Sequence, residues 1–142
     1  MVEIVYEPEL RPESRQAVVD GLVAFNRAQT PDFKGEFGTI GLLLKNPETG
    51  ATDGGLTARF GFGWMFVELL FVPERLRGQG IGRQLMAQAE AVARDKACIG
   101  IYLDTFSFQA PGFYQKLGYA VFGEIPDYPA GSSRFFLSKR LS

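Results

Sequence analysis

The chain has 142 residues, 46% of them hydrophobic, and a formal net charge of -1 at pH 7. A chain of this length supports one hydrophobic core, so we expect a single domain over residues 1–142. The nearly neutral charge excludes the basic face of a nucleic-acid-binding domain, so we expect no nucleic acid among the partners.

Signals for membranes and secretion are missing from the sequence. The longest apolar stretch, Trp64–Val72, is much shorter than the roughly 20 residues that a membrane-spanning helix needs. The first residues, MVEIVYEPEL, carry acids where a signal peptide carries bases. We therefore expect a cytoplasmic protein with no membrane partner.

The sequence contains no His and a single Cys, Cys98. This inventory excludes zinc sites built from Cys and His, Ser-His-Asp triads and Cys-His dyads, so we expect no metal site. Proton transfer must fall to carboxylates, tyrosines, lysines or water. A lone Cys between a helical pattern and an apolar strand pattern is most often a small buried hydrophobic residue.

The first half of the chain predicts one strand, one helix and a meander. Residues 2–8, VEIVYEP, are typical of a short strand, and apolar residues at helical spacing predict a helix between the prolines at positions 12 and 31. Three strands then follow in succession, the first two joined as a hairpin, over residues 38–46, 56–63 and 64–72.

The second half predicts a helix, a strand, a short helix and two more strands. Ile81, Leu85, Ala89 and Val92 recur at helical spacing. The later elements are a strand over 98–106, a short helix over 110–118, and strands over 119–125 and 134–141. Together, the predicted helices and strands indicate an α+β fold with a mixed sheet.

Three glycines at alternate positions, Gly78, Gly80 and Gly82, separate the third strand of the meander from the helix that follows. Such a turn presents unpaired backbone N–H groups and the positive end of a helix dipole, and glycine lets a phosphate approach closely. Arg77 and Arg83 add positive charge. The turn predicts an anion site; the alternative is a tight connection whose glycines serve packing only.

Spacing limits which phosphate ligand fits this turn. A dinucleotide motif needs G-x-G-x-x-G, but Arg83 stands three residues after Gly80. A P-loop needs a Lys after its glycines, and none follows here. A nucleotide-binding module therefore stays only as an alternative.

The turn resembles the acyl-CoA signature R/Q-x-x-G-x-G/A of the GNAT family of N-acetyltransferases, met here as Arg77, Gly80 and Gly82. Downstream, SFQAPGFYQKLGY resembles the family's N-x-x-A-x-x-F-Y-x-K-L-G-F/Y segment, with Ser107 in place of its Asn and Tyr114 as its Tyr. The resemblance implies a single-domain GNAT-like fold: a central mixed, mostly antiparallel sheet with a splayed strand, flanked by helices.

The resemblance also implies a cofactor site for acetyl-CoA as cosubstrate. Backbone groups of the strand end would bind the pantetheine arm as if it were an added strand, and the amides of the glycine turn would bind the pyrophosphate. The implied cofactor residues are Leu70, Phe71, Val72, Arg77, Gly78, Gln79, Gly80, Ile81, Gly82, Arg83 and Ser107.

The implied activity is acetyl transfer from the CoA thioester directly to a primary amine. Tyr114 matches the family tyrosine that donates to the thiolate, and its alternative role is an aromatic core residue. Glu68 is the lone acid in an apolar strand, which suits a water-mediated base or a pair with Arg59. Asp104 is a further candidate base. A non-catalytic acyl-CoA-binding sensor is the second alternative.

The acceptor amine and the oligomeric state stay open at this level. The resemblance places the acceptor pocket at residues 24–37 and 124–134, where acids and aromatics are balanced by bases, so no acceptor is named. Residues 134–141 would leave an unpaired edge if they lay at the sheet margin, which favours a homodimer.

Overall fold

The computed structural model describes all residues from Met1 to Ser142 and divides into two compact units, residues 1–34 and residues 35–142. The first unit contains one helix, α1 (Pro12–Gln29), within the limits that the prolines predict. Residues 2–8 form no strand, so that prediction is wrong. A strand exists only where a neighbour completes its hydrogen bonds, and this segment has none.

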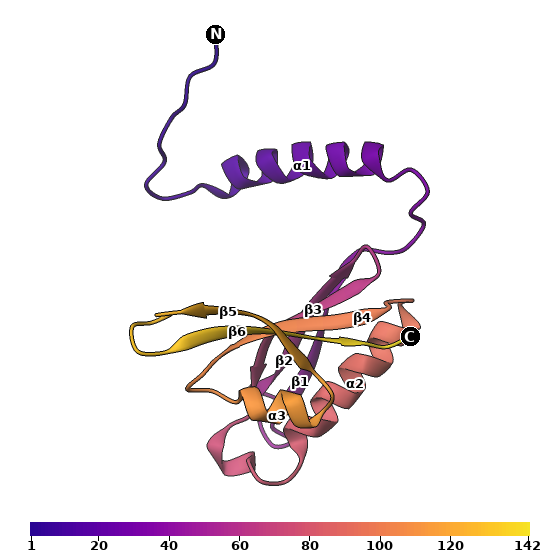
Figure 1. Ribbon diagram of the computed structural model, residues 1–142, viewed down its shortest axis with the longest axis vertical. Coiled ribbons are helices and arrows are strands. Elements are labelled where there is room, and N and C mark those ends of the chain that lie inside the picture. Colours follow the sequence, from indigo (N-terminus) through magenta and orange to yellow (C-terminus); the bar gives the residue numbers. More distant parts are fainter. The chain divides into compact units, whose positions relative to one another are not determined.

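The second unit is built on one six-stranded sheet in the order β1-β2-β3-β4-β6-β5 (Figure 1). Neighbouring strands are antiparallel except β3 and β4, which are parallel, so the expected mixed, mostly antiparallel sheet is confirmed. The strands are β1 (Gly38–Lys45), β2 (Thr52–Gly61), β3 (Trp64–Phe71), β4 (Gly100–Phe106), β5 (Ala120–Pro126) and β6 (Ser133–Arg140).

Helices α2 (Ile81–Asp95) and α3 (Pro111–Lys116) lie on the same side of this sheet (Figure 1). A short 3-10 helix, η1 (Glu74–Leu76), precedes α2. No helix of the structure combines the length and the apolar character that crossing a bilayer requires. The core between helices and sheet has its largest fully buried side chains at Leu56, Met65, Met86, Ile101, Leu103 and Leu137.

β3 and β4 pair over only part of their length and then separate. Their parallel ladder runs from Trp64 opposite Gly100 to Val67 opposite Leu103. Glu68 has no opposite residue on β2, because the pairing register shifts at this point, and it therefore forms a β-bulge. The bulge turns the strand, so the end of β3 leaves its neighbour and forms the expected splayed strand.

The last strand does not lie at the sheet margin. β6 is hydrogen-bonded to β4 on one side and to β5 on the other, so the edges of the sheet are β1 and β5. The condition under which residues 134–141 would leave an unpaired edge is therefore not met. Local sequence pattern does not show this order. β5 precedes β6 in the sequence, but β6 lies between β4 and β5 in the sheet.

A polar cluster is buried where α2 meets the segment after α3. Glu90 of α2 is only 8% exposed, and it accepts hydrogen bonds from the Tyr119 hydroxyl (3.0 Å) and the Lys139 ammonium (3.0 Å). Lys139 also donates to the Leu117 carbonyl (2.9 Å). This Glu90 cluster joins α2, the α3–β5 connection and β6 through fully partnered polar groups.

Candidate active site

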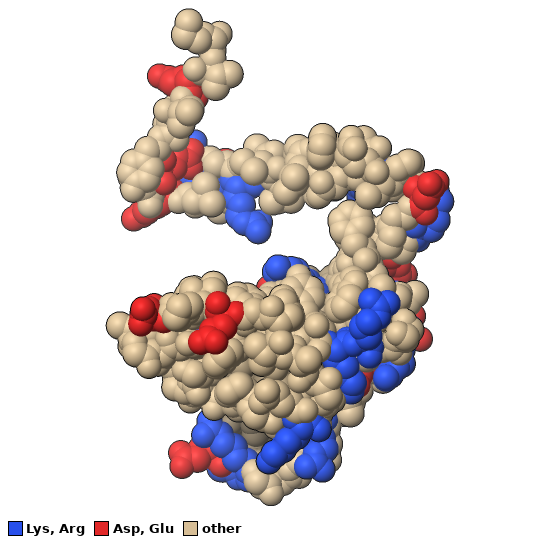
Figure 2. Space-filling model, in the orientation of Figure 1, with Lys and Arg blue, Asp and Glu red and all other residues tan.

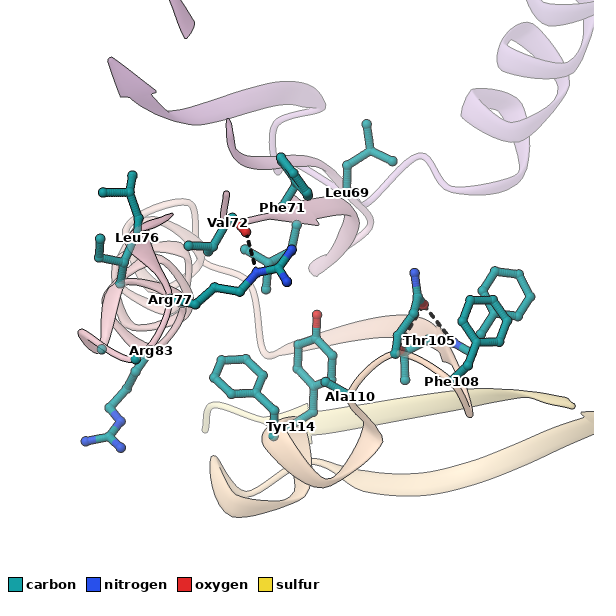
Figure 3. A pocket seen from close by; sticks show the side chains of 18 of the residues that line it. Leu69, Phe71, Val72, Leu76, Arg77, Arg83, Thr105, Phe108, Ala110 and Tyr114 are labelled. Atoms are coloured by element: carbon teal, nitrogen blue, oxygen red, sulfur yellow. Dashed lines mark hydrogen bonds between the residues drawn. The ribbon is translucent and has the colours of Figure 1, made fainter. Parts of the chain in front are cut away.

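A cavity of about 940 Å³ opens where β3 and β4 separate (Figure 3). Its walls come from the end of β3, the glycine turn, the start of α2, the end of β4 and the start of α3. Segments far apart in the sequence thus meet at one site. This volume lies at the upper end of the usual range for small-molecule and cofactor sites.

One wall of the cavity is the free edge of β3. From Glu68 to Phe71 this strand has no partner on the side of β4, so its backbone groups on that side are available to a ligand. Leu70, Phe71 and Val72 all line the cavity. The Val72 carbonyl accepts a hydrogen bond from Nε of Arg77 (2.9 Å), which lays the guanidinium beside this wall (Figure 3).

The glycine turn continues this wall. Gly78 and Gly80 have φ of +77° and +78°, in the left-handed region that side chains rarely adopt. A Cβ on either glycine would meet no atom within 4 Å, so backbone conformation rather than space requires glycine there. At Gly82 a Cβ would lie 3.2 Å from the Phe113 ring, so this glycine instead allows close packing of α2 on α3.

The start of α2 presents unpartnered amides to the cavity. No side chain caps this end, and the first helical hydrogen bond runs from Gln84 N to the Gly80 carbonyl (3.0 Å). The amides before it have no partner within the helix and carry the positive end of its dipole. Ile81, Gly82 and Arg83 all line the cavity, and Figure 2 shows basic side chains gathered at this end of the unit.

Tyr114 of α3 is 8% exposed and points its hydroxyl toward the gap between β3 and β4 (Figure 3). Its ring lies between those of Phe113 (5.0 Å) and Tyr119 (6.2 Å). Burial, and then the negative charge of Asp104, raise the pKa of Tyr114 to about 12. The hydroxyl is therefore protonated at neutral pH and able to donate a proton.

Glu68 lines the cavity from the bulge of β3 and also pairs with Arg59, with 3.1 Å between NH1 and Oε2. The predicted pair with Arg59 is therefore present, and the role of Glu68 as a base stays a prediction. The two side chains are 56% and 37% exposed, and a pair this open to water contributes at most about 1 kcal/mol. The pair leaves one carboxylate oxygen of Glu68 without a partner in the chain.

Asp104 also lines the cavity, but two nitrogens of Arg134 bind it, Nε at 3.0 Å and NH2 at 2.9 Å. The hydrogen bond to Asp104 raises the pKa of Arg134, so the guanidinium of this bidentate pair stays charged. Arg134 further donates to the Tyr128 hydroxyl (2.9 Å). Sequence reasoning missed this clamp, because its residues meet only through the pairing of β4 with β6.

Two predicted cofactor residues do not line the cavity. Ser107 faces β6 instead: its hydroxyl accepts from Ser133 N (3.0 Å), and its amide donates to the Ser133 carbonyl (2.8 Å). Gln79 donates weakly to the Arg75 carbonyl (3.4 Å). The other predicted residues, namely Glu68, Leu70, Phe71, Val72, Arg77, Gly78, Gly80, Ile81, Gly82, Arg83 and Tyr114, all line the cavity.

The loop after β4 supplies residues that sequence reasoning did not select. Oε1 of Gln109 accepts from the Phe106 amide (2.8 Å) and from the Thr105 hydroxyl (3.1 Å), which fixes the loop (Figure 3). Phe106 and Phe108 line the cavity beside it. The one available signal was a Gln within the second motif, two residues after Ser107. No group of His, Cys, Asp or Glu side chains is placed to hold a metal ion.

The family model for the acetyltransferase (GNAT) domain matches residues 22–121. A blasticidin-S acetyltransferase from Streptomyces morookaense is 46% identical over 95 residues, which cover 66% of this chain and 70% of the relative. Acetyltransferase Atu2258 from Agrobacterium fabrum is 37% identical over 128 residues, 90% of this chain and 91% of the relative.

Solved structures show the same likeness. A crystal structure assigned to the acetyltransferases from Agrobacterium tumefaciens matches with a TM-score of 0.90 and 34% identity, over 98% of this chain and 99% of that chain. A structure from Bacillus anthracis, assigned as a streptothricin acetyltransferase in complex with acetyl coenzyme A, matches with a TM-score of 0.57 and 21% identity over 65% of this chain and 57% of that one. At this identity, the second likeness concerns the fold alone.

Proposed function

We infer the reaction from the family, because the chain belongs to the GNAT family of acetyltransferases. It is an N-acetyltransferase that uses acetyl-CoA as its cosubstrate. This membership leaves no support for the alternatives of a chance nucleotide-binding module or a non-catalytic sensor.

We propose that acetyl-CoA lies along the cavity wall that joins β3 to α2. The observation that carries this proposal is the continuity of two features: a strand edge without a partner from Glu68 to Phe71, and a turn with uncapped amides from Arg77 to Arg83. The backbone of Leu70 and Val72 would hold the arm, and the turn would hold the pyrophosphate. Gln79 and Ser107 would contribute by shaping their loops.

When bound, acetyl-CoA supplies an acetyl thioester for attack by an amine. Tyr114 acts as the acid that protonates the departing sulfur, because its hydroxyl opens into the cavity and its raised pKa keeps the proton in place. Cys98 is buried and does not line the cavity, so no cysteine is placed to form an acyl-enzyme. The acetyl group therefore passes directly to a primary amine.

We propose Glu68 as the general base that takes the proton from the amine through a water molecule. It lines the cavity and keeps one carboxylate oxygen free, whereas Arg134 holds both oxygens of Asp104. The guanidinium pair engages both oxygens of Asp104, so neither is free to bind the water that would carry the proton. Asp104 therefore serves the site through its charge and its clamp.

A panel of primary amines tests this proposal. We expect the purified chain to release CoA from acetyl-CoA when the panel contains a suitable small amine. Blasticidin S belongs in the panel, because the relative that is 46% identical over 95 residues is named a blasticidin-S acetyltransferase. The acetylated product is identified by mass spectrometry. CoA release without an acetylated amine would contradict direct transfer to an acceptor.

We also propose that the protein forms a homodimer in the cytoplasm, where its cosubstrate is available. The sheet ends in two edge strands, β1 and β5, and Phe122 on β5 is 62% exposed. An edge strand with an exposed apolar side chain gains stability when a second copy of the chain covers it. Light scattering at micromolar concentration should give twice the mass of one chain, and a monomer mass would contradict the dimer.

A further inference from the structure

Two stacked phenylalanines lie beside the catalytic end of the cavity. The rings of Phe106 and Phe108 are stacked, with centroids 5.2 Å apart and planes 6° apart. Tyr128 supports Phe106 from another side, with centroids 5.4 Å apart. Phe108 is 64% exposed and lines the cavity, so its ring presents an open face there. We name Phe106, Phe108 and Tyr128 the aromatic shelf.

The loop after β4, which carries Phe108, is held by hydrogen bonds on both sides. The Gln109 side chain holds the Phe106 amide and the Thr105 hydroxyl, and Ser107 makes two hydrogen bonds to Ser133 of β6. An exposed Phe on a mobile loop would fold back onto apolar surface. Here the backbone is fixed, so a planar ligand group meets a surface that is already in position.

Two carboxylates line the same cavity as the shelf, and each is paired with an arginine. The Arg134 guanidinium lies 5.9 Å from the Phe106 centroid and 5.1 Å from that of Tyr128, where it neutralises Asp104. On the cavity wall, Glu68 pairs with Arg59 through one carboxylate oxygen and keeps the other free. A ligand in this cavity therefore meets an open ring face and a carboxylate, which together match a planar group joined to an ammonium.

We propose that the acceptor is a primary amine that carries an aromatic or heteroaromatic ring, which stacks on Phe108 while the amine faces Glu68. This inference rests on the proposed function and names the substrate class of the same site. Ring stacking of this kind favours a planar group over a non-planar one by about two- to tenfold. Phe108 is then a specificity-determining residue.

The test compares 2-phenylethylamine with 2-cyclohexylethylamine, which share their carbon number and ammonium group and differ in the planarity of the ring. We expect kcat/KM to be about two- to tenfold higher for the phenyl compound. Phe108→Leu, which keeps an apolar side chain without a ring face, should abolish the preference. Phe122→Leu is the matched control, because Phe122 is 62% exposed on β5 and does not line the cavity.

Calorimetric binding of both amines in the presence of CoA gives the same ratio without turnover. Equal kcat/KM and equal affinity for the two amines in the wild type, or an unchanged ratio in Phe108→Leu, would overturn the shelf. If no amine of any kind is acetylated, the proposed function fails instead, and the binding ratio still decides the shelf. A preference that survives Phe122→Leu and disappears in Phe108→Leu supports the inference.

Discussion

Tyr114 and Tyr119 lie five positions apart, and each has a carboxylate and a cation nearby. Around Tyr119, the Glu90 carboxylate accepts from both the tyrosine hydroxyl and Lys139. Around Tyr114, the Asp104 carboxylate is held by Arg134, while the tyrosine hydroxyl makes no hydrogen bond to the chain and lines the cavity. The same three chemical groups thus form a closed cluster in one place and an open one in the other.

The difference teaches how this fold separates stability from chemistry. Burial, and then Glu90, raise the pKa of Tyr119, and its proton is already engaged with that carboxylate. Burial raises the pKa of Tyr114 as well, but its proton faces the ligand space. Changes to the closed cluster should therefore affect unfolding, and changes to the open one should affect turnover.

The largest expected effect is on turnover. Tyr114→Phe keeps the ring and its packing and deletes the hydroxyl, so kcat should fall by roughly ten- to a thousandfold. Affinity for CoA and the melting temperature should change little. Tyr119→Phe is the matched control: it should lower the melting temperature and leave kcat nearly unchanged. Wild-type turnover in Tyr114→Phe would assign this tyrosine to the core alone.

The second prediction concerns the closed cluster of Glu90, Tyr119 and Lys139. Glu90→Gln removes the buried charge that binds Lys139, so the free energy of unfolding should fall by about 2–3 kcal/mol. Urea unfolding measures the loss, and kcat of the folded variant should stay within about twofold of the wild type. A larger effect on kcat than on stability would show that the two clusters are not separate.

The third prediction concerns the turn that serves the open cluster. Gly80→Val forces a branched side chain into the left-handed region, which costs about 1–3 kcal/mol, so the turn shifts and CoA affinity should fall by about tenfold or more. Gly50→Val is the control, because Gly50 has φ of +75° and open space around it but lies outside the cavity. Equal calorimetric affinities for CoA in both variants would contradict the phosphate role of the turn.

The fourth prediction follows from the pKa of Tyr114, which burial raises from 10 to about 12. Between pH 10 and pH 12 the unfolded chain loses the Tyr114 proton while the folded chain keeps it. The contribution of Tyr114 to the free energy of unfolding is therefore complete below pH 10 and is lost between pH 10 and pH 12. The loss should be about 1.4 kcal/mol per pH unit within that window. Urea unfolding at a series of pH values should show that the free energy of unfolding falls more steeply with pH in the wild type than in Tyr114→Phe. Equal dependence on pH in the two proteins would contradict the prediction.

The smallest expected effect tests the base. Glu68→Gln should lower kcat/KM and flatten the acidic limb of its pH profile, because that limb reports ionisation of the free enzyme's base or of the amine. Asp53→Asn is the control, since Asp53 pairs with Arg75 and does not line the cavity. An unchanged limb in Glu68→Gln would transfer the role to Asp104 or to loss of the amine proton to bulk water.

Local pattern predicted much of this protein. α2, the β1–β3 meander and the glycine turn follow from spacing of apolar residues and from the backbone freedom of glycine, which act over a few neighbouring residues. The two motifs assigned Tyr114 and the turn to one family site, and both line the same cavity. These features depend on short stretches, so the sequence alone determines them.

Tertiary structure decided what depends on distant neighbours. Residues 2–8 carry a strand pattern but no strand forms, and β6 lies inside the sheet rather than at its edge. Ser107 faces Ser133, and Asp104 meets Arg134, only because β4 pairs with β6 in one particular register. Strand pairing joins segments across long stretches of chain, and its register decides which side chains meet, so no local pattern contains that information.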